Sequence, residues 1–147
     1  MLICGLLALY VSGVGMRRSV YEAQVVAHQI EPPFTLESAL YFRRVTQVFQ
    51  EGSLPAQDSL VQIPEGVPVY ETYSIGSEFI HAWLAKLFPS SMSLAQQLRW
   101  IEVSWASLGV VFLALWVGRW QRSWVAGMFG GAAYAFLLST VIRSTGI

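Results

Sequence analysis

The chain has 147 residues, of which 54% are hydrophobic, 14% aromatic and 12% charged, and its mean hydropathy is +0.50. This composition excludes a disordered tail or a charged interaction arm and points to a membrane protein. Nine basic residues balance nine acidic ones, so no basic field exists to attract nucleic acid. A single cysteine, Cys4, excludes a disulfide within the chain. The lipid bilayer is the expected partner.

Three apolar segments predict three transmembrane helices. Residues 1–16 carry no charge, and the first basic residues follow this segment, whereas they precede the apolar stretch of a signal peptide. We therefore expect a first span whose beginning has been lost. The second span is expected at 99–118. The third covers 123–142, where twenty uncharged residues at about 1.5 Å each reach across roughly 30 Å of hydrocarbon. Small residues at steps of four in this last segment predict close helix packing: Gly127, Gly131 and Ala135.

The charges between the spans predict the orientation. Two arginines in the short turn 119–122 mark it as cytoplasmic, because basic residues concentrate in cytoplasmic loops. Residues 17–98 then form a loop on the non-cytoplasmic side, and 143–147 begin a second external loop. Arg17 and Arg18 oppose this rule, and a functional role at the outer face would account for them. The sequence thus predicts an all-α, multi-pass membrane protein with a large, partly helical external loop between its first and second spans.

Two amphipathic helices are expected in that loop. The first, near 36–51, follows a rigid Glu-Pro-Pro break and ends at Gly52, a typical C-cap. The second, near 73–88, is expected to lie on or against the membrane domain through an apolar stripe. This stripe consists of Gly76, Phe79, Ile80, Trp83, Leu84 and Leu87.

The first loop helix has two predicted faces. Its apolar face holds four residues, Ala39, Phe42, Val45 and Phe49. A second face carries a carboxylate, a phenol and a guanidinium, from Glu37, Tyr41 and Arg44. This face is suited to binding a cation or a phosphate-bearing ligand, and it is equally consistent with a solvated ion-pair face.

Motifs of soluble enzymes are absent from the sequence. There is no glycine-rich phosphate loop after a strand and no serine nucleophile elbow. His28 and His81 lack the spacing of metal ligands, so we expect both on the surface or in packing.

The order of four short motifs carries a resemblance. They are L-E-S-A-L-Y-F-R at 36–43, G-S-L-P-A-Q-D at 52–58, P-E-G at 64–66 and R-S-T-G at 143–146. This order resembles the N-terminal part of the catalytic subunit of oligosaccharyltransferases, membrane glycosyltransferases of the GT-C fold. In that family an external loop carries an acidic residue and an Arg six residues later, followed by G-x-x-P-x-x-D and P-x-G. The last motif resembles the start of a second acidic motif, although its Gly arrives one residue early.

The resemblance implies roles for individual residues. Glu37 takes the position of the metal-binding acid, usually Asp, and Arg43 that of the Arg closing the motif, so both are candidate catalytic residues. The metal is expected to be Mg²⁺ or Mn²⁺, which would neutralise the charge that develops on a lipid diphosphate leaving group. Possible support roles fall to Tyr41, Arg44, Asp58 and Arg143.

The activity implied by the resemblance is transfer of a sugar or oligosaccharide. The donor would be linked to polyprenyl phosphate, and the acceptor would be a polypeptide Asn or another group, at a bacterial inner membrane or its equivalent. One carboxylate cannot hold the cation alone, so we expect the chain to be an N-terminal fragment that is inactive by itself. Two alternatives stay open: another GT-C transferase of mannosyl or aminoarabinose type, and a small non-enzymatic membrane protein whose external loop binds a partner.

Overall fold

The computed structural model describes residues 2–28 and 37–137. Its chain divides into two compact units, which we call unit 1 (Met1–Thr35 with Arg99–Ile147) and unit 2 (Leu36–Leu98). Both units are mostly helical, as the sequence predicts. The all-α prediction needs one addition, because unit 2 also contains a pair of two-residue strands.

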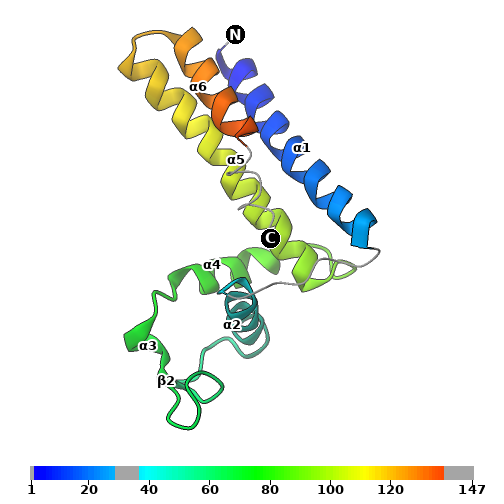
Figure 1. Cartoon of the computed structure of the whole chain (residues 1–147), viewed down its shortest axis with the longest axis vertical. Coiled ribbons are helices and arrows are strands. Elements are labelled where there is room, and N and C mark those ends of the chain that lie inside the picture. The colour runs from blue at the N-terminus through cyan, green and yellow to red at the C-terminus, as the bar shows by residue number, and fades with distance from the viewer. Residues whose placement is uncertain (1, 29–36, 138–147) are drawn as a thin grey trace. The chain divides into compact units, whose positions relative to one another are not determined.

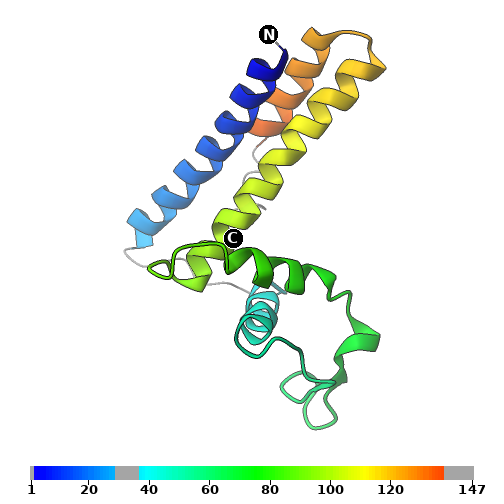
Figure 2. The same ribbon diagram turned by 180° about the vertical axis from the view of Figure 1, so that it is seen from behind.

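Unit 1 is a bundle of three helices. These are α1 (Leu2–His28), the part of α5 (Leu94–Trp120) that follows residue 98, and α6 (Trp124–Phe136). Figures 1 and 2 show α6 between α1 and α5, on the side of the turn that joins α5 to α6. The buried core contains Leu9, Val110, Ala114 and Ala135.

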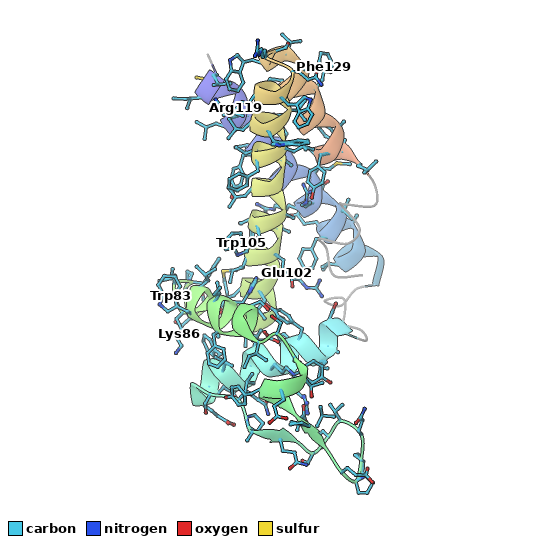
Figure 3. The ribbon with its side chains drawn as sticks, turned by 90° about the vertical axis from the view of Figure 1, so that its left-hand side faces the viewer. Trp83, Lys86, Glu102, Trp105, Arg119 and Phe129 are labelled. Atoms are coloured by element: carbon cyan, nitrogen blue, oxygen red, sulfur yellow. The ribbon has the colours of Figure 1, made fainter. Side chains whose placement is uncertain are left out.

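Two of these helices are long and apolar enough to cross a membrane: α1 over Leu2–Ala23 and α5 over Leu94–Trp120. Most residues of both helices are not buried inside the protein, and large apolar side chains such as Ile3, Leu7 and Phe112 are exposed. An exposed apolar surface of this kind is unusual for a soluble domain and suits contact with lipid. Figure 3 shows Arg119 near the turn end of α5, with Glu102 and Trp105 toward the other end.

The helix that contains the predicted first span continues beyond residue 16, because α1 ends at His28. Arg17 is fully buried and donates a hydrogen bond from Nη1 to the Gly13 carbonyl at 3.1 Å. Arg18 is exposed and forms an ion pair with Glu22, one turn further along, at 2.6 Å. Each guanidinium has a partner on α1, so the helix continues past both arginines.

The second helix begins five residues before the predicted start at 99, and its N-terminus explains why. The Gln96 N–H donates to Ser93 Oγ at 3.2 Å, and the Ser93 N–H donates to Gln96 Oε1 at 3.3 Å. These reciprocal bonds form a capping box, which satisfies donors that the first helical turn would otherwise leave unpaired. The S-x-x-Q signature is present in the sequence at 93–96.

The third helix is shorter than the predicted span of 123–142. It begins after Ser123, whose Oγ accepts a hydrogen bond from the Ala126 N–H at 3.4 Å, and it ends at Phe136, because Leu137 is extended. The absence of charge shows that a segment is compatible with lipid, but it does not determine the backbone conformation. The uncharged run 123–142 therefore could not predict where the helix ends. Residues 138–147, including the predicted loop start at 143–147, lie outside the described residues.

Small residues bring α6 close to α5. The predicted strip of Gly127, Gly131 and Ala135 is buried, which confirms its role in packing. A Cβ placed on Gly127 would lie 2.4 Å from the Ala114 carbonyl oxygen and 2.9 Å from Gly118 Cα. Backbone therefore faces backbone at this contact.

Unit 2 is built on α2 (Glu37–Glu51) and α4 (Gly76–Ala85), which pack against each other. Between them lie β1 (Gln57–Asp58), β2 (Val67–Pro68) and the short helix α3 (Val69–Thr72). The strands pair antiparallel, with Gln57 opposite Pro68 and Asp58 opposite Val67. Gly52 ends α2 as predicted, with φ of 78° and its N–H bonded to the Val48 carbonyl at 2.9 Å.

The buried face of α4 is not the apolar stripe of the sequence prediction. Its buried residues are Glu78, Ala82 and Ala85, whereas Ile80 and Trp83 are exposed. Figure 3 shows Trp83 on α4 and Lys86 directly after its last residue. Small side chains allow close helix contact, so the alanine face packs and the large apolar residues remain outside.

The α5–α6 contact gives a first prediction. Gly127→Ala should destabilise the chain by about 1–3 kcal/mol, because the added methyl overlaps backbone atoms that cannot move independently. Thermal unfolding in detergent measures the loss. Gly15→Ala on α1 is the matched control, since no heavy atom lies within 4 Å of its added Cβ. We expect this control to be neutral or slightly more stable, and equal losses in the two variants would contradict the packing argument.

Candidate functional site

The candidate site is the part of unit 2 where α2 meets the following loop and α4. The α2 polar cluster, as we call it, consists of Tyr41, Arg43 and Arg44 on α2 with their partners Asp58, Tyr73 and His81. All of these partners come from later segments of unit 2. The cluster thus joins α2 to β1, to the residue after α3 and to α4.

Arg43 and Asp58 form an ion pair between Nη2 and Oδ2. The Asp58 side chain is only 6% exposed and the Arg43 side chain 28%. The second carboxylate oxygen, Oδ1, accepts a hydrogen bond from the Leu60 N–H at 3.1 Å. Both carboxylate oxygens are therefore engaged within unit 2, and Asp58 serves both as a turn former and as the counter-ion of Arg43.

The glycine of the P-E-G motif is required by this turn. Gly66 has φ of 74°, a conformation that glycine adopts without steric cost. A Cβ at this position would lie 3.1 Å from the Asp58 carbonyl oxygen and 3.1 Å from the Gln57 side chain. The Val69 N–H also donates to the Ala56 carbonyl at 3.0 Å and closes the loop behind β1. The G-x-x-P-x-x-D and P-x-G segments thus form one compact turn, which is tied to α2 by Arg43.

Tyr41 and His81 meet across the α2–α4 contact. The Tyr41 hydroxyl lies 2.7 Å from His81 Nδ1, and their rings pack edge to face with centroids 5.6 Å apart. His81 Nδ1 is also 2.8 Å from the Ser77 carbonyl oxygen. Nδ1 of His81 thus lies within hydrogen-bond distance of two oxygens, the Tyr41 hydroxyl on α2 and the Ser77 carbonyl one turn earlier on α4. His81 packs here, in line with the sequence interpretation.

Arg44 is buried, with 4% of its surface exposed. Its guanidinium lies over the Tyr73 ring, with Cζ 3.7 Å from the ring centroid. Nε and Nη2 are buried and have no hydrogen-bond acceptor among the described residues. The interpretation of the Glu37, Tyr41 and Arg44 face as a solvated ion-pair face is therefore wrong for Arg44, which is buried against Tyr73, whereas Tyr41 is half-buried.

Two of the predicted site residues cannot be placed. Glu37 is the first residue of α2, but its side chain lies outside the described part of the structure, and Arg143 lies entirely outside it. Among the described residues, no group of three or more His, Cys, Asp or Glu side chains is arranged to hold a metal ion. Asp58 already uses both oxygens, so it is not a free ligand. The described residues do not fit a complete site for a divalent cation.

Sequence reasoning missed one member of the cluster, Tyr73, and one buried acid of α4, Glu78. Tyr73 has no motif and lies 29 positions after Arg44, so helical spacing could not connect them. Glu78 is only 3% exposed and accepts a hydrogen bond from Ser77 Oγ at 3.0 Å. The sole sequence signal for Glu78 is its spacing of four and seven residues from Ala82 and Ala85, which places a carboxylate on the small-residue face.

The Arg43–Asp58 pair gives a second prediction. Asp58→Ala should cost about 3 kcal/mol, the lower end of the range for breaking a buried pair, because Arg43 retains some contact with water. Urea or thermal unfolding of the full chain in detergent measures this loss. A double-mutant cycle with Arg43→Met should show strong coupling between the two residues.

The exposed Arg18–Glu22 pair of α1 is the matched control for this cycle. Both side chains are 56% exposed, so Glu22→Ala should cost less than about 1 kcal/mol. If the two acids gave equal losses, or if Asp58 and Arg43 behaved additively, the pair would not anchor the loop.

Comparisons with protein-family models, with curated proteins and with solved structures give no match for this chain. The arguments for function therefore come from the residues of the chain and their arrangement.

Proposed function

We propose that the chain belongs to a membrane glycosyltransferase of the GT-C type, most similar to the catalytic subunit of oligosaccharyltransferases. Such an enzyme would transfer a sugar or oligosaccharide from a polyprenyl-phosphate-linked donor to a polypeptide or another acceptor. The observation that carries the proposal is the Arg43–Asp58 ion pair. It joins the Arg that closes the first motif to the Asp of G-x-x-P-x-x-D. The resemblance rests on the order of these motifs in the sequence, and the ion pair shows that the two motifs are also in contact.

The shape of the loop supports the same proposal. Gly66 is needed because it approaches the Asp58 backbone closely with a positive φ. The P-x-G motif thus has a structural reason to follow the G-x-x-P-x-x-D motif. A chance similarity of short motifs would not explain why the two motifs contact each other. In this proposal Arg43 is a positioning residue, since its charge is directed to Asp58, and Glu37 is the acid directed to the ligand.

The membrane arrangement completes the proposal. Unit 2 lies in the sequence between α1 and α5, the two helices that are long and apolar enough to cross a membrane. The last turn of α5 carries Arg119 and the turn after it carries Arg122, both exposed, and basic residues at such turns favour the cytoplasm. Unit 2 would then lie on the non-cytoplasmic side, with α6 and the residues after it forming a third pass.

A divalent cation would supply charge neutralisation at the lipid diphosphate as the glycosidic bond breaks. Glu37 offers one hard oxygen ligand of the kind that Mg²⁺ or Mn²⁺ prefers. The proposal requires further oxygen ligands, which the described residues do not bring together.

One observation favours a second candidate, a non-enzymatic membrane protein that binds a partner through its external loop. The α4 helix exposes Ile80 and Trp83 on one side, and Leu87 follows with 68% of its surface exposed. Exposed apolar side chains at helical spacing are typical of interaction surfaces. Such a protein would not depend on Glu37.

The role of Glu37 gives a third prediction. In the full-length gene product, Glu37→Gln should reduce metal-dependent sugar transfer from a polyprenyl-diphosphate-linked donor by at least a hundredfold, because the amide removes a charged ligand. The assay measures release of polyprenyl diphosphate with and without added Mn²⁺ or Mg²⁺.

Glu51→Gln is the control variant, since Glu51 is exposed at the other end of the same helix. It should keep normal transfer and normal membrane insertion. Transfer by Glu37→Gln at the wild-type rate would overturn the metal role and favour the partner-binding candidate.

The orientation gives a fourth prediction. In a Cys4→Ser background, a cysteine at the exposed residue Ser53 of unit 2 should react with a membrane-impermeant maleimide in intact cells. A cysteine at Gln121, exposed in the α5–α6 turn, should react only after permeabilisation. The reverse labelling pattern would place unit 2 in the cytoplasm, where a polyprenyl-linked donor used at the outer face could not reach it.

A further inference from the structure

Arg44 is a buried cation without a counter-ion among the residues that the structure describes. Its neighbour Arg43 is neutralised by Asp58, whereas the Arg44 guanidinium lies over the face of the Tyr73 ring. Stacking on an aromatic ring satisfies the flat face of a guanidinium and leaves its N–H donors unused. Nε and Nη2 are these unused donors, and both are buried.

The two unpaired atoms lie on the same edge of the guanidinium. Nε–H and the Nη2–H on its side point in parallel, and this fork is the edge that binds two oxygens of one carboxylate or phosphate. A buried guanidinium without an acceptor is strongly destabilising, and buried arginines in proteins are nearly always paired. This edge is therefore suited to an oxyanion.

The acids described in unit 2 do not provide that oxyanion. Asp58 is engaged by Arg43 and by the Leu60 N–H. Glu78 is buried on α4 and accepts from Ser77 Oγ, and no oxygen of Glu78 lies within 4.0 Å of an Arg44 nitrogen. The other described acids of unit 2, Glu51, Glu65 and Glu71, are exposed.

We propose that the Arg44 edge, held by Tyr73, is a binding site for the phosphate oxygens of a phosphorylated ligand. The site needs no metal: a stacked arginine supplies one positive charge and two parallel donors to two oxygens of one phosphate group. Assignment of that phosphate to a polyprenyl-linked donor rests on the proposed function, whereas phosphate binding itself does not. Because Nε and Nη2 are buried, a ligand reaches this edge only after the side chains that cover it move.

The test measures pyrophosphate binding to the full chain in a neutral detergent, by calorimetry and by the rise in melting temperature that a ligand of the folded state produces. Sodium chloride at equal ionic strength is the reference. Wild-type protein should bind pyrophosphate, and Arg44→Lys should bind at least tenfold more weakly, since lysine keeps the charge but lacks the fork. Arg122→Gln, which changes an exposed arginine of the α5–α6 turn, should bind like wild type.

A second variant covers the case in which Arg44→Lys does not fold. Tyr73→Leu removes the ring that orients the guanidinium and leaves Arg44 in place, so it should also weaken binding by several fold. No pyrophosphate binding by wild type, or equal binding by wild type and both variants, would overturn the site. The test also covers an internal ion pair between Glu78 and Arg44. If Glu78→Gln lowered the stability as much as Arg44→Gln, and the double variant were no less stable than either single variant, Glu78 would be the missing acceptor. The proposal would then fail.

Comparison of ligands identifies the source of the phosphate. Tighter binding of polyprenyl diphosphate than of pyrophosphate, lost in Arg44→Lys, would assign the site to a lipid-linked ligand. Equal affinity would assign it to a soluble phosphate and retain the site. Binding measured this way does not depend on Glu37, so it can succeed where the transfer assay fails, and the two proposals are separable.

Discussion

The ion pair between Arg43 and Asp58 is the constraint on which unit 2 depends. It connects the middle of α2 to β1, and because Asp58 is nearly inaccessible to water, the pair fixes the loop to one place on the helix. A buried carboxylate without its partner costs roughly 3–5 kcal/mol, which is comparable to a large part of the stability of a small domain. The positive φ of Gly66 and the β1–β2 pairing act on the same segment, because both set how the chain returns past Asp58.

Charged residues in this protein lie in surroundings that are more apolar than their charge would suggest. Arg17 is fully buried in the middle of α1 and bonds to the Gly13 carbonyl one turn earlier. Arg44 is buried with the face of its guanidinium on the Tyr73 ring. The Arg17 side chain bonds within its own helix, whereas the long Arg44 side chain reaches a partner that spacing along one helix does not reveal. Charge therefore marks positions of structural consequence in both units.

Close helix contact is achieved in the two units by the same means. In unit 1, Gly127 allows the α6 backbone to approach Ala114 and Gly118 of α5. In unit 2, Ala82 and Ala85 form the buried side of α4. Small side chains permit a short interhelical distance, and the large apolar residues are displaced to the outer side. In unit 1 this outer side suits lipid, and on α4 it leaves Ile80 and Trp83 exposed.

Sequence by itself determined the features that depend on local composition and local stereochemistry. The apolar stretches of α1 and α5, the span of α2, its cap at Gly52 and the packing strip of α6 all follow from residue type and spacing, because helices and caps are set within a few residues. The bounds of the spans did not follow: α1 passes Arg17 and α6 ends at Phe136. The position of a charged residue in the sequence does not predict which helix will bury its side chain. Only the tertiary structure paired Arg43 with Asp58, set Arg44 on Tyr73, and chose the alanine side of α4 for burial. Those contacts join residues 15 or more positions apart, and no periodicity within one helix can specify them.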